Sequence, residues 1–200
     1  MNRKEIMRRS VFALICAVML LAGQSSSSAD PPETADVMDQ GGVTVLASDG
    51  ARLVRQTDGV GAAVAMPAPT SGTYVYPDGT EPGHPEVFTL WMFVFNFPEH
   101  CSQPCDFDDT MDPDVQFGVY NVAGHVNAGS VLNLSGRIGI GEPAGAPPNV
   151  VPHPLVNPAG AEIHLAVTSH GGLDSATLPG EFKVPTGSPF CGCWWVAIFD

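Results

Sequence analysis

Positively charged side chains are scarce in this sequence: 8 Lys and Arg stand against 21 Asp and Glu in 200 residues, for a formal net charge of -13. Nucleic-acid binding needs clustered Lys and Arg to neutralise phosphates, and attraction to anionic membrane surfaces has the same requirement. The sequence therefore predicts no nucleic-acid partner. Because only 14% of the residues are charged, a coiled coil or a highly charged disordered chain is also excluded.

Long hydrophobic runs are absent except near the start of the chain. Met1–Ser10 is basic, and the apolar run Val11–Gly23 follows it, an order typical of a secretory signal peptide. The run is shorter than the roughly 20 apolar residues that span a bilayer, and no run of that length occurs downstream. We expect residues 1–29 to be the signal peptide, cleaved after Ala29, which predicts a secreted or periplasmic location and no membrane span in the mature chain. The mature chain keeps four basic residues: Arg52, Arg55, Arg137 and Lys183.

No segment shows a sustained helical period with capping residues. Gly (22) and Pro (19) are frequent instead, and they separate short apolar runs at turn signals such as Asp49-Gly50 and Asp58-Gly59. This spacing predicts an all-β fold: an antiparallel β-sandwich or barrel with long Pro/Gly-rich loops. Residues 30–42 are expected to be a disordered leader, and residues 43–200 a single β-rich domain. The expected strands are 43–46, 52–56, 60–66, 74–76, 87–97, 115–126, 131–140, 161–169 and 193–199.

Two segments differ from the other apolar runs and loops. Residues 87–97 contain no charge and are too aromatic and β-branched to favour a helix, so they are predicted to form a central strand. Residues 141–158 contain six prolines and are expected to form a long connection without secondary structure. Such loops are often functional, and a solvated spacer is the alternative.

The mature chain has four cysteines, Cys101, Cys105, Cys191 and Cys193. An even number in an exported protein predicts two disulfides. A bridge within Cys191-Gly192-Cys193 would be strained, so we expect Cys101 and Cys105 each to pair with one of the two later cysteines. Such bridges would close loops of about 90 residues, worth on the order of 4 kcal/mol. A four-thiolate zinc site is the alternative.

The segment from residue 161 to residue 172 carries the clearest chemical pattern. Side chains alternate across a strand, so Glu162, His164 and His170 would share one face while the apolar residues between them fill the core. Glu162 and His164 would stand roughly 7 Å apart at Cα, close enough for both to reach one ion or one substrate atom. His125, from a neighbouring strand, could add a third imidazole. The simpler interpretation is that Glu162 and His164 are hydrogen-bonded to each other on the solvated face of an amphipathic strand. The functional alternative is a divalent metal site or an acid–base pair.

A second candidate is the acidic loop 106–114, which contains five aspartates. Secreted proteins often bind calcium in such loops, but the EF-hand pattern fails here because Phe117 stands at the position of its last glutamate. A solvated acidic loop is the simpler interpretation. The sequence also lacks recognisable nucleophile, phosphate-binding and dinucleotide-binding motifs, which favours binding over catalysis.

Several motifs occur together in a fixed order between residue 87 and the C-terminus. They are Phe88-Thr89-Leu90-Trp91, Val94-Phe95-Asn96, Pro98, Cys101, Cys105, Gly124-His125-Val126, Ala161-Glu162-Ile163-His164-Leu165 and Ser169-His170-Gly171. In these motifs the chain resembles a group of exported bacterial β-rich proteins for which no activity is known. The resemblance therefore implies no function, but it brings His125, Glu162, His164 and His170 forward as one set. Thr168 stands where the group often has an arginine, so any anion site to which that arginine contributes is not expected in this chain.

The sequence as a whole predicts an exported β domain stapled by disulfides, with a binding or structural role rather than a catalytic one. Its partner would be an extracellular or periplasmic ligand or protein. The alternative hypothesis is a metal-binding protein or metalloenzyme that uses the strand face of Glu162, His164 and His170.

Overall fold

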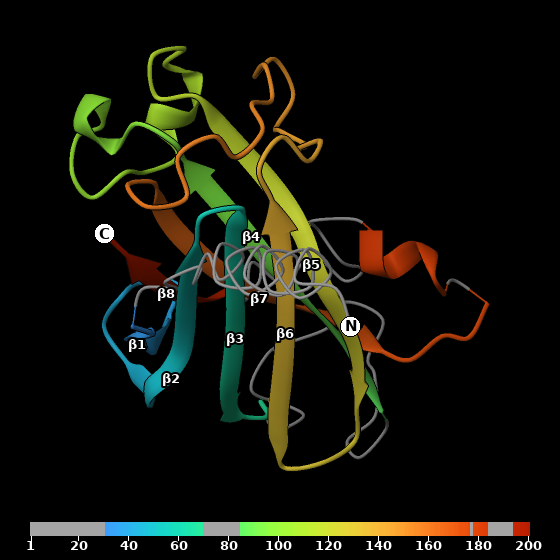
Figure 1. Ribbon diagram of the computed structural model, residues 1–200. Coiled ribbons are helices and arrows are strands. Elements are labelled where there is room, and N and C mark those ends of the chain that lie inside the picture. Colours follow the sequence, from blue (N-terminus) through green and yellow to red (C-terminus); the bar gives the residue numbers. More distant parts are fainter. Residues whose placement is uncertain (1–30, 70–84, 177, 184–193) are drawn as a thin grey trace, which may run out of the picture.

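The computed structural model describes residues 31–69, 85–176, 178–183 and 194–200 (Figure 1). Within these residues the chain forms strands and three short 3₁₀ turns and contains no α-helix, which confirms the predicted all-β class. None of these residues belongs to a helix long and apolar enough to cross a membrane. The elements are β1 (Glu33–Asp39), β2 (Val45–Gln56), β3 (Gly59–Pro67), β4 (Glu86–Phe95), η1 (Pro98–His100), η2 (Asp108–Met111), β5 (Phe117–Asn127), β6 (Val131–Gly139), β7 (Glu162–Gly172), η3 (Gly180–Lys183) and β8 (Trp194–Phe199).

The strands form one antiparallel sheet in the order β5-β4-β7-β8-β1-β2-β3-β6, which is nearly closed into a barrel (Figure 1). β4 lies between β5 and β7, so the uncharged segment is an interior strand, as predicted. The two edge strands, β5 and β6, approach each other closely at Gly136. A Cβ at this position would lie 2.2 Å from the carbonyl oxygen of Val122, so only glycine allows the approach.

The barrel is filled by apolar side chains from alternate positions of its strands. Leu90 and Met92 of β4 and Ile163 and Leu165 of β7 are buried in this cluster, together with Trp195 of β8. Full burial of each such side chain contributes about 1.5–3 kcal/mol to folding. The inward positions of β7 are those that the two-residue period predicts.

A second, smaller apolar cluster lies outside the barrel. It is made of Phe95, Cys105, Val115 and Phe117, and it forms where the 96–116 loop folds back over the outer face of β4 and β5. β4 is therefore buried on both faces, like the strands of a covered sheet. This double burial is the physical reason for the absence of charge in that segment.

The predicted disordered leader is wrong for the described part of residues 30–42. Residues 33–39 form β1, which pairs with β2 on one side and β8 on the other. Val37 is buried in the core, and Asp36 and Asp39 accept backbone N–H groups. Asp39 accepts the N–H groups of Val43 and Thr44, and these hydrogen bonds, that of Val43 first, lower its pKa. The acidic composition of this segment does not resemble that of a strand, because its aspartates are used in hydrogen bonds to the β1–β2 turn and to β2.

The turn expected at Asp49-Gly50 is also wrong, because β2 continues through it. The pairing of β1 with β2 is irregular between Ala35 and Val37, and Asp49 has a φ of 50°. These two residues form an irregularity within one long strand instead of ending it. The strand expected at 74–76 and residue 193 of the last expected strand lie outside the described residues.

The proline-rich connection 141–158 is tied to the sheet and is not a solvated spacer. Gly145 and Val119 exchange backbone hydrogen bonds, and Leu155 is completely buried. The hydroxyl of Tyr120 donates to the carbonyl of Glu142 and accepts the N–H of Leu155 at 2.8 Å. Burial raises the pKa of this phenol. The loop is therefore part of the packed structure.

Candidate functional site

The two faces of β7 separate as the sequence predicts, but neither face is solvated. Glu162 and His170 are 1% and 0% exposed, and the side chain of His164 is 17% exposed. The expected solvated face is wrong because the 96–116 loop covers the outer side of the sheet near Glu162, and η3 packs over β4 and β5 farther along. A polar strand face is thus enclosed by segments distant in sequence.

Glu162 and His164 form a close pair, as the spacing predicted. Nε2 of His164 lies 2.6 Å from Oε1 of Glu162, and the same oxygen accepts the backbone N–H of Cys105 at 2.8 Å. An ionised carboxylate only accepts hydrogen bonds, so the ring nitrogen donates. With the proton on Nε2, the neutral form of the imidazole has its lone pair at Nδ1. Within the described part of the chain, Nδ1 makes no hydrogen bond.

A pocket of about 410 Å³ opens beside His164, a size within the range of small-molecule sites. The ring of Phe95 lies 5.0 Å from the imidazole, centroid to centroid. Phe107 contributes an aromatic ring that is 70% exposed, and exposed aromatics beside a concave surface are typical of recognition sites. The lining residues come from the β1–β2 turn, β4, the acidic loop, β7 and β8: Gln40, Phe93, Phe95, Asp106, Phe107, Thr110, His164, Ala166 and Val196.

His170 belongs to a different cluster, which corrects its assignment to the site of His164. Its Nε2 lies 2.8 Å from the hydroxyl of Thr89, which also accepts the indole N–H of Trp91 at 2.8 Å. Phe182 of η3 packs against Gly124 of the neighbouring strand, where a Cβ would lie 2.4 Å from the ring. His170 is therefore a buried histidine hydrogen-bonded within the sheet, and burial lowers its pKa.

Acidification is expected to destabilise the protein through His170. Its pKa is lowered from the ordinary value of 6.5 by burial, so below about pH 6.5 the unfolded chain takes up a proton that the folded chain refuses. Above that pH, His170 is neutral in both states and burying it carries no penalty for a missing proton. As the pH falls toward the folded-state pKa, the unfolded chain is increasingly favoured because it can bind the proton. The cost is about 1.4 kcal/mol for each pH unit between the two pKa values.

Urea unfolding of His170→Gln between pH 7.5 and pH 5 measures this effect. The amide of glutamine can still reach Thr89, and the variant is expected to lose less stability on acidification than the wild type. His125→Gln replaces an exposed histidine and is expected to keep the wild-type pH dependence. Parallel curves for His170→Gln and the wild type would contradict the assignment.

His125 does not join His164 either. It lies directly opposite Phe88 in the ladder between β4 and β5, and opposite residues share one face of a sheet. Phe88 points into the barrel, whereas His164 is on the outer side. Of the four residues predicted as one metal set, the structure therefore brings together Glu162 and His164 alone.

The predicted cross-pairing of the cysteines is wrong for Cys101 and Cys105, which form a disulfide with each other, with Cα atoms 5.0 Å apart. The intervening residues turn back on themselves, so near neighbours in sequence are in bonding range without any contact to the end of the chain. Cys191 and Cys193 lie outside the described residues.

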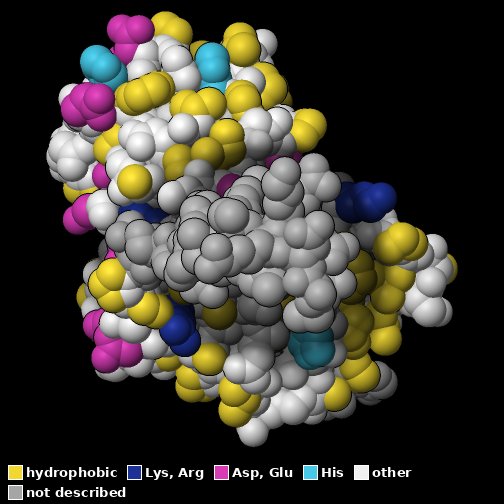
Figure 2. All heavy atoms as spheres, viewed as in Figure 1, with side chains coloured by type: hydrophobic (Ala, Val, Ile, Leu, Met, Phe, Trp, Pro, Cys, Tyr) yellow, Lys and Arg dark blue, Asp and Glu magenta, His cyan; other side chains and the backbone are white. Residues whose placement is uncertain are grey.

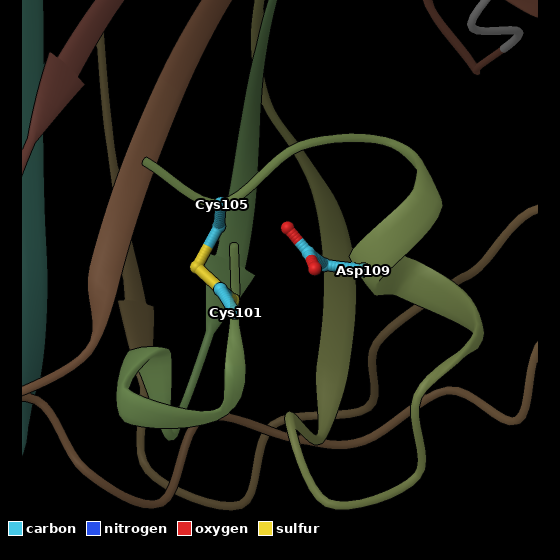
Figure 3. Close-up of side chains that lie close together, drawn as sticks. All are labelled: Cys101, Cys105 and Asp109. Atoms are coloured by element: carbon cyan, nitrogen blue, oxygen red, sulfur yellow. A yellow bond between two sulfur atoms is a disulfide. The ribbon is translucent and has the colours of Figure 1, made fainter. Parts of the chain in front are cut away.

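The carboxylates of the acidic loop bind their own backbone. Asp106 accepts the N–H groups of Asp108 and Asp109, and Asp109 accepts those of Ser102 and Asp106. In the described ranges, three potential metal ligands converge only at Cys101, Cys105 and Asp109, where Asp109 reaches from η2 toward the disulfide (Figure 3). The two sulfur atoms are joined in the disulfide and are not thiolates, so Cys101 and Cys105 do not contribute to a four-thiolate zinc site.

Apart from His164 and Asp106 of the acidic loop, the sequence did not identify the residues that line the pocket. Phe93 and Val196 occur in apolar runs that read as core, and Phe107 lies in a loop considered only for its charge. The available signal was the uncharged segment 87–97, which requires a cover on both faces and hence an enclosed outer surface. Comparison with protein-family models, curated proteins and solved structures finds no match to the chain.

Proposed function

We propose that the chain is an exported binding module whose ligand is a small molecule with an apolar body, seated in the pocket beside His164. The observation that carries this proposal is the aromatic-lined pocket around one imidazole whose Nδ1 has no hydrogen bond within the described chain. Apolar walls with few convergent polar groups are typical of small-molecule sites. The predicted signal peptide and the disulfide support export, because disulfides persist in oxidising compartments.

The hydrogen bonds of the pocket favour binding over nucleophilic catalysis. Among the described lining residues, Thr110 alone carries a hydroxyl, and it donates to the carbonyl of Phe107 at 2.7 Å. A Glu–His pair acts in covalent catalysis by accepting a proton from a nucleophile within hydrogen-bond reach. The hydroxyl of Thr110 is already engaged, so the pair is better suited to holding a ligand.

The metal-binding alternative rests on the same imidazole, since a carboxylate behind a histidine is the usual support of a metal ligand. Zinc sites in proteins have three or four protein ligands, and the other predicted imidazoles lie elsewhere. We expect the mature protein, purified without chelator or metal-binding tag, to contain no stoichiometric metal. About one ion per chain, absent from His164→Ala, would favour the metalloprotein instead.

Titration with the neutral fluorescent probe N-phenyl-1-naphthylamine tests the binding role. We expect saturable one-site binding that weakens about tenfold in Phe107→Ala, because truncating a ring that lines a pocket removes more than about 1 kcal/mol of contact. Phe107 is 70% exposed, so the substitution leaves the core intact.

Val131→Ala is the matched control, since it removes an exposed apolar side chain from β6, away from the lining residues. It is expected to bind the probe as the wild type does. Absence of saturable binding, or equal binding by Phe107→Ala and the wild type, would refute the role of the pocket.

A further inference from the structure

We propose that the ligand of this pocket is an organic cation, an amine carried on an apolar or aromatic body. This inference rests on the proposed binding function and names the chemical class of its ligand. Three independent features of the pocket carry it: the sign of its charges, its aromatic walls and the direction of its hydrogen bonds.

The charges at the pocket are negative. Asp106 lines it, and Glu162 lies directly behind His164. No Lys or Arg is among the described lining residues. In the described ranges, neither carboxylate is paired with Lys or Arg, because the ion-paired arginines, Arg55 and Arg137, bind Glu33 and Asp58. A cationic ligand would meet the Asp106 carboxylate, with the Glu162 carboxylate behind His164, whereas an anionic ligand would be repelled by Asp106.

The walls suit a cation with an apolar body. Phe93, Phe95 and Phe107 line the same pocket. A cation within about 6 Å of an aromatic ring centre is attracted by the negative potential of the ring face, and the same rings bury hydrocarbon. A small inorganic cation would leave these apolar walls in contact with water, so the combination favours an organic ammonium.

Two groups at the pocket can accept hydrogen bonds, and the side-chain amide of Gln40 can both donate and accept. The contact with Glu162 selects the tautomer of neutral His164 that carries its proton on Nε2, and in this form Nδ1 presents a lone pair. An ammonium group donates to such an atom, and the Asp106 carboxylate is a second acceptor. A ligand carboxylate needs donors, and the neutral imidazole offers none at Nδ1. Thr110 donates to Phe107 and is not available for this role.

The charge of the chain as a whole favours the approach of a cation. Acidic side chains lie at several places on the face in Figure 2, where Lys and Arg atoms are few. The whole chain has a net charge of -13, and such a field raises the rate at which positively charged ligands arrive.

Three probes of similar shape separate charge from apolar contact: 2-phenylethylamine, 2-phenylethanol and phenylacetate. Their dissociation constants are measured by calorimetry on the full mature chain at pH 7.5. We expect the amine to bind at least tenfold more tightly than the alcohol, and phenylacetate to bind most weakly. Salt is expected to reduce the preference for the amine, since it screens the carboxylates.

Asp106→Asn is the informative variant, because the amide oxygen can still accept the N–H groups of Asp108 and Asp109 while the charge is lost. We expect it to weaken the amine about fivefold and to leave the alcohol unchanged. Asp114→Asn changes the net charge equally on the same loop, outside the lining residues, and is expected to keep the wild-type preference.

The possible results distinguish the two proposals. Equal or tighter binding of the alcohol or phenylacetate, with loss in Phe107→Ala, would overturn the cation inference and leave the pocket as a binding site. Binding of the naphthyl probe with no binding of the amine would overturn it too. Failure of all four compounds to bind would remove the proposed function itself.

Discussion

Replacement of Arg55 by methionine is expected to lower the free energy of unfolding by about 3 kcal/mol or more, because it leaves buried backbone carbonyls without donors at about 1–3 kcal/mol each. Arg55 is only 5% exposed. Its Nε lies 2.7 Å from the carboxylate of Glu33, and this ion pair connects β2 to β1. Without the guanidinium, this partly buried carboxylate would have no cationic partner.

The guanidinium also binds three backbone carbonyls from distant parts of the chain. Nη1 donates to Pro158 and to Ala161 at 3.0 and 2.7 Å, and Nη2 donates to Asp200 at 3.3 Å. One side chain therefore holds the end of the proline-rich loop, the start of β7 and the last residue of the chain. Lysine is not an adequate replacement, because one ammonium group lacks the planar fork of donors.

Arg52→Met is the matched control, since it removes the same charge from an exposed position of the same strand. Surface ion pairs contribute about 0–1 kcal/mol, so the control is expected to remain close to the wild type in urea unfolding. Equal losses in Arg52→Met and Arg55→Met would show that Arg55 does not have the clamping role assigned here. Glu33→Gln, with 34% of its side chain exposed, is expected to cost less than Arg55→Met.

Asn96→Ala is expected to cost about 3 kcal/mol or more, because it leaves several buried backbone groups without partners at about 1–3 kcal/mol each. Asn96 is fully buried at the end of β4. Its Nδ2 donates to the carbonyls of Gln116 and Pro154 at 2.8 and 3.0 Å. Its Oδ1 accepts the N–H of Val156 at 2.8 Å. The side chain thus joins two loops that share no secondary structure.

Asn133→Ala, on the exposed side of β6, is the control and is expected to change stability by less than about 0.5 kcal/mol. Asn96→Asp keeps the acceptor but loses both donors, so it should fall close to Asn96→Ala. Unfolding in urea measures all three. A loss below about 1 kcal/mol for Asn96→Ala would mean that water replaces the amide and that the loops do not depend on it.

The correct predictions from the sequence depended on two local features: the alternation of side chains along a strand and the residues that form turns. The two-residue period of β7 correctly placed Ile163 and Leu165 in the barrel, and put Glu162 and His164 within reach of each other. Turn residues and the scarcity of helical periodicity indicated the all-β class. These features depend on residues a few positions apart, whose relation is set by strand geometry.

Errors arose where the outcome depended on segments far apart in the chain. His125 and His164 lie on strands that both flank β4, but the register of β5 directs His125 toward the side of Phe88. The acidic residues 33–39 have few features of a strand until β2 and β8 supply partners on both sides. Pairing and register are set by the whole sheet and cannot be read from either strand alone.

The sequence by itself determined the strand class, the core face of β7, the Glu162–His164 pair and the expectation of export. Only the tertiary structure decided that the 96–116 loop covers that strand face, that His170 lies apart with Thr89, and that the aromatic pocket forms beside His164. The physical reason is that alternation along a strand fixes which residues share a face. What covers that face depends on long loops, and here those loops are positioned by hydrogen bonds from single buried side chains such as Asn96.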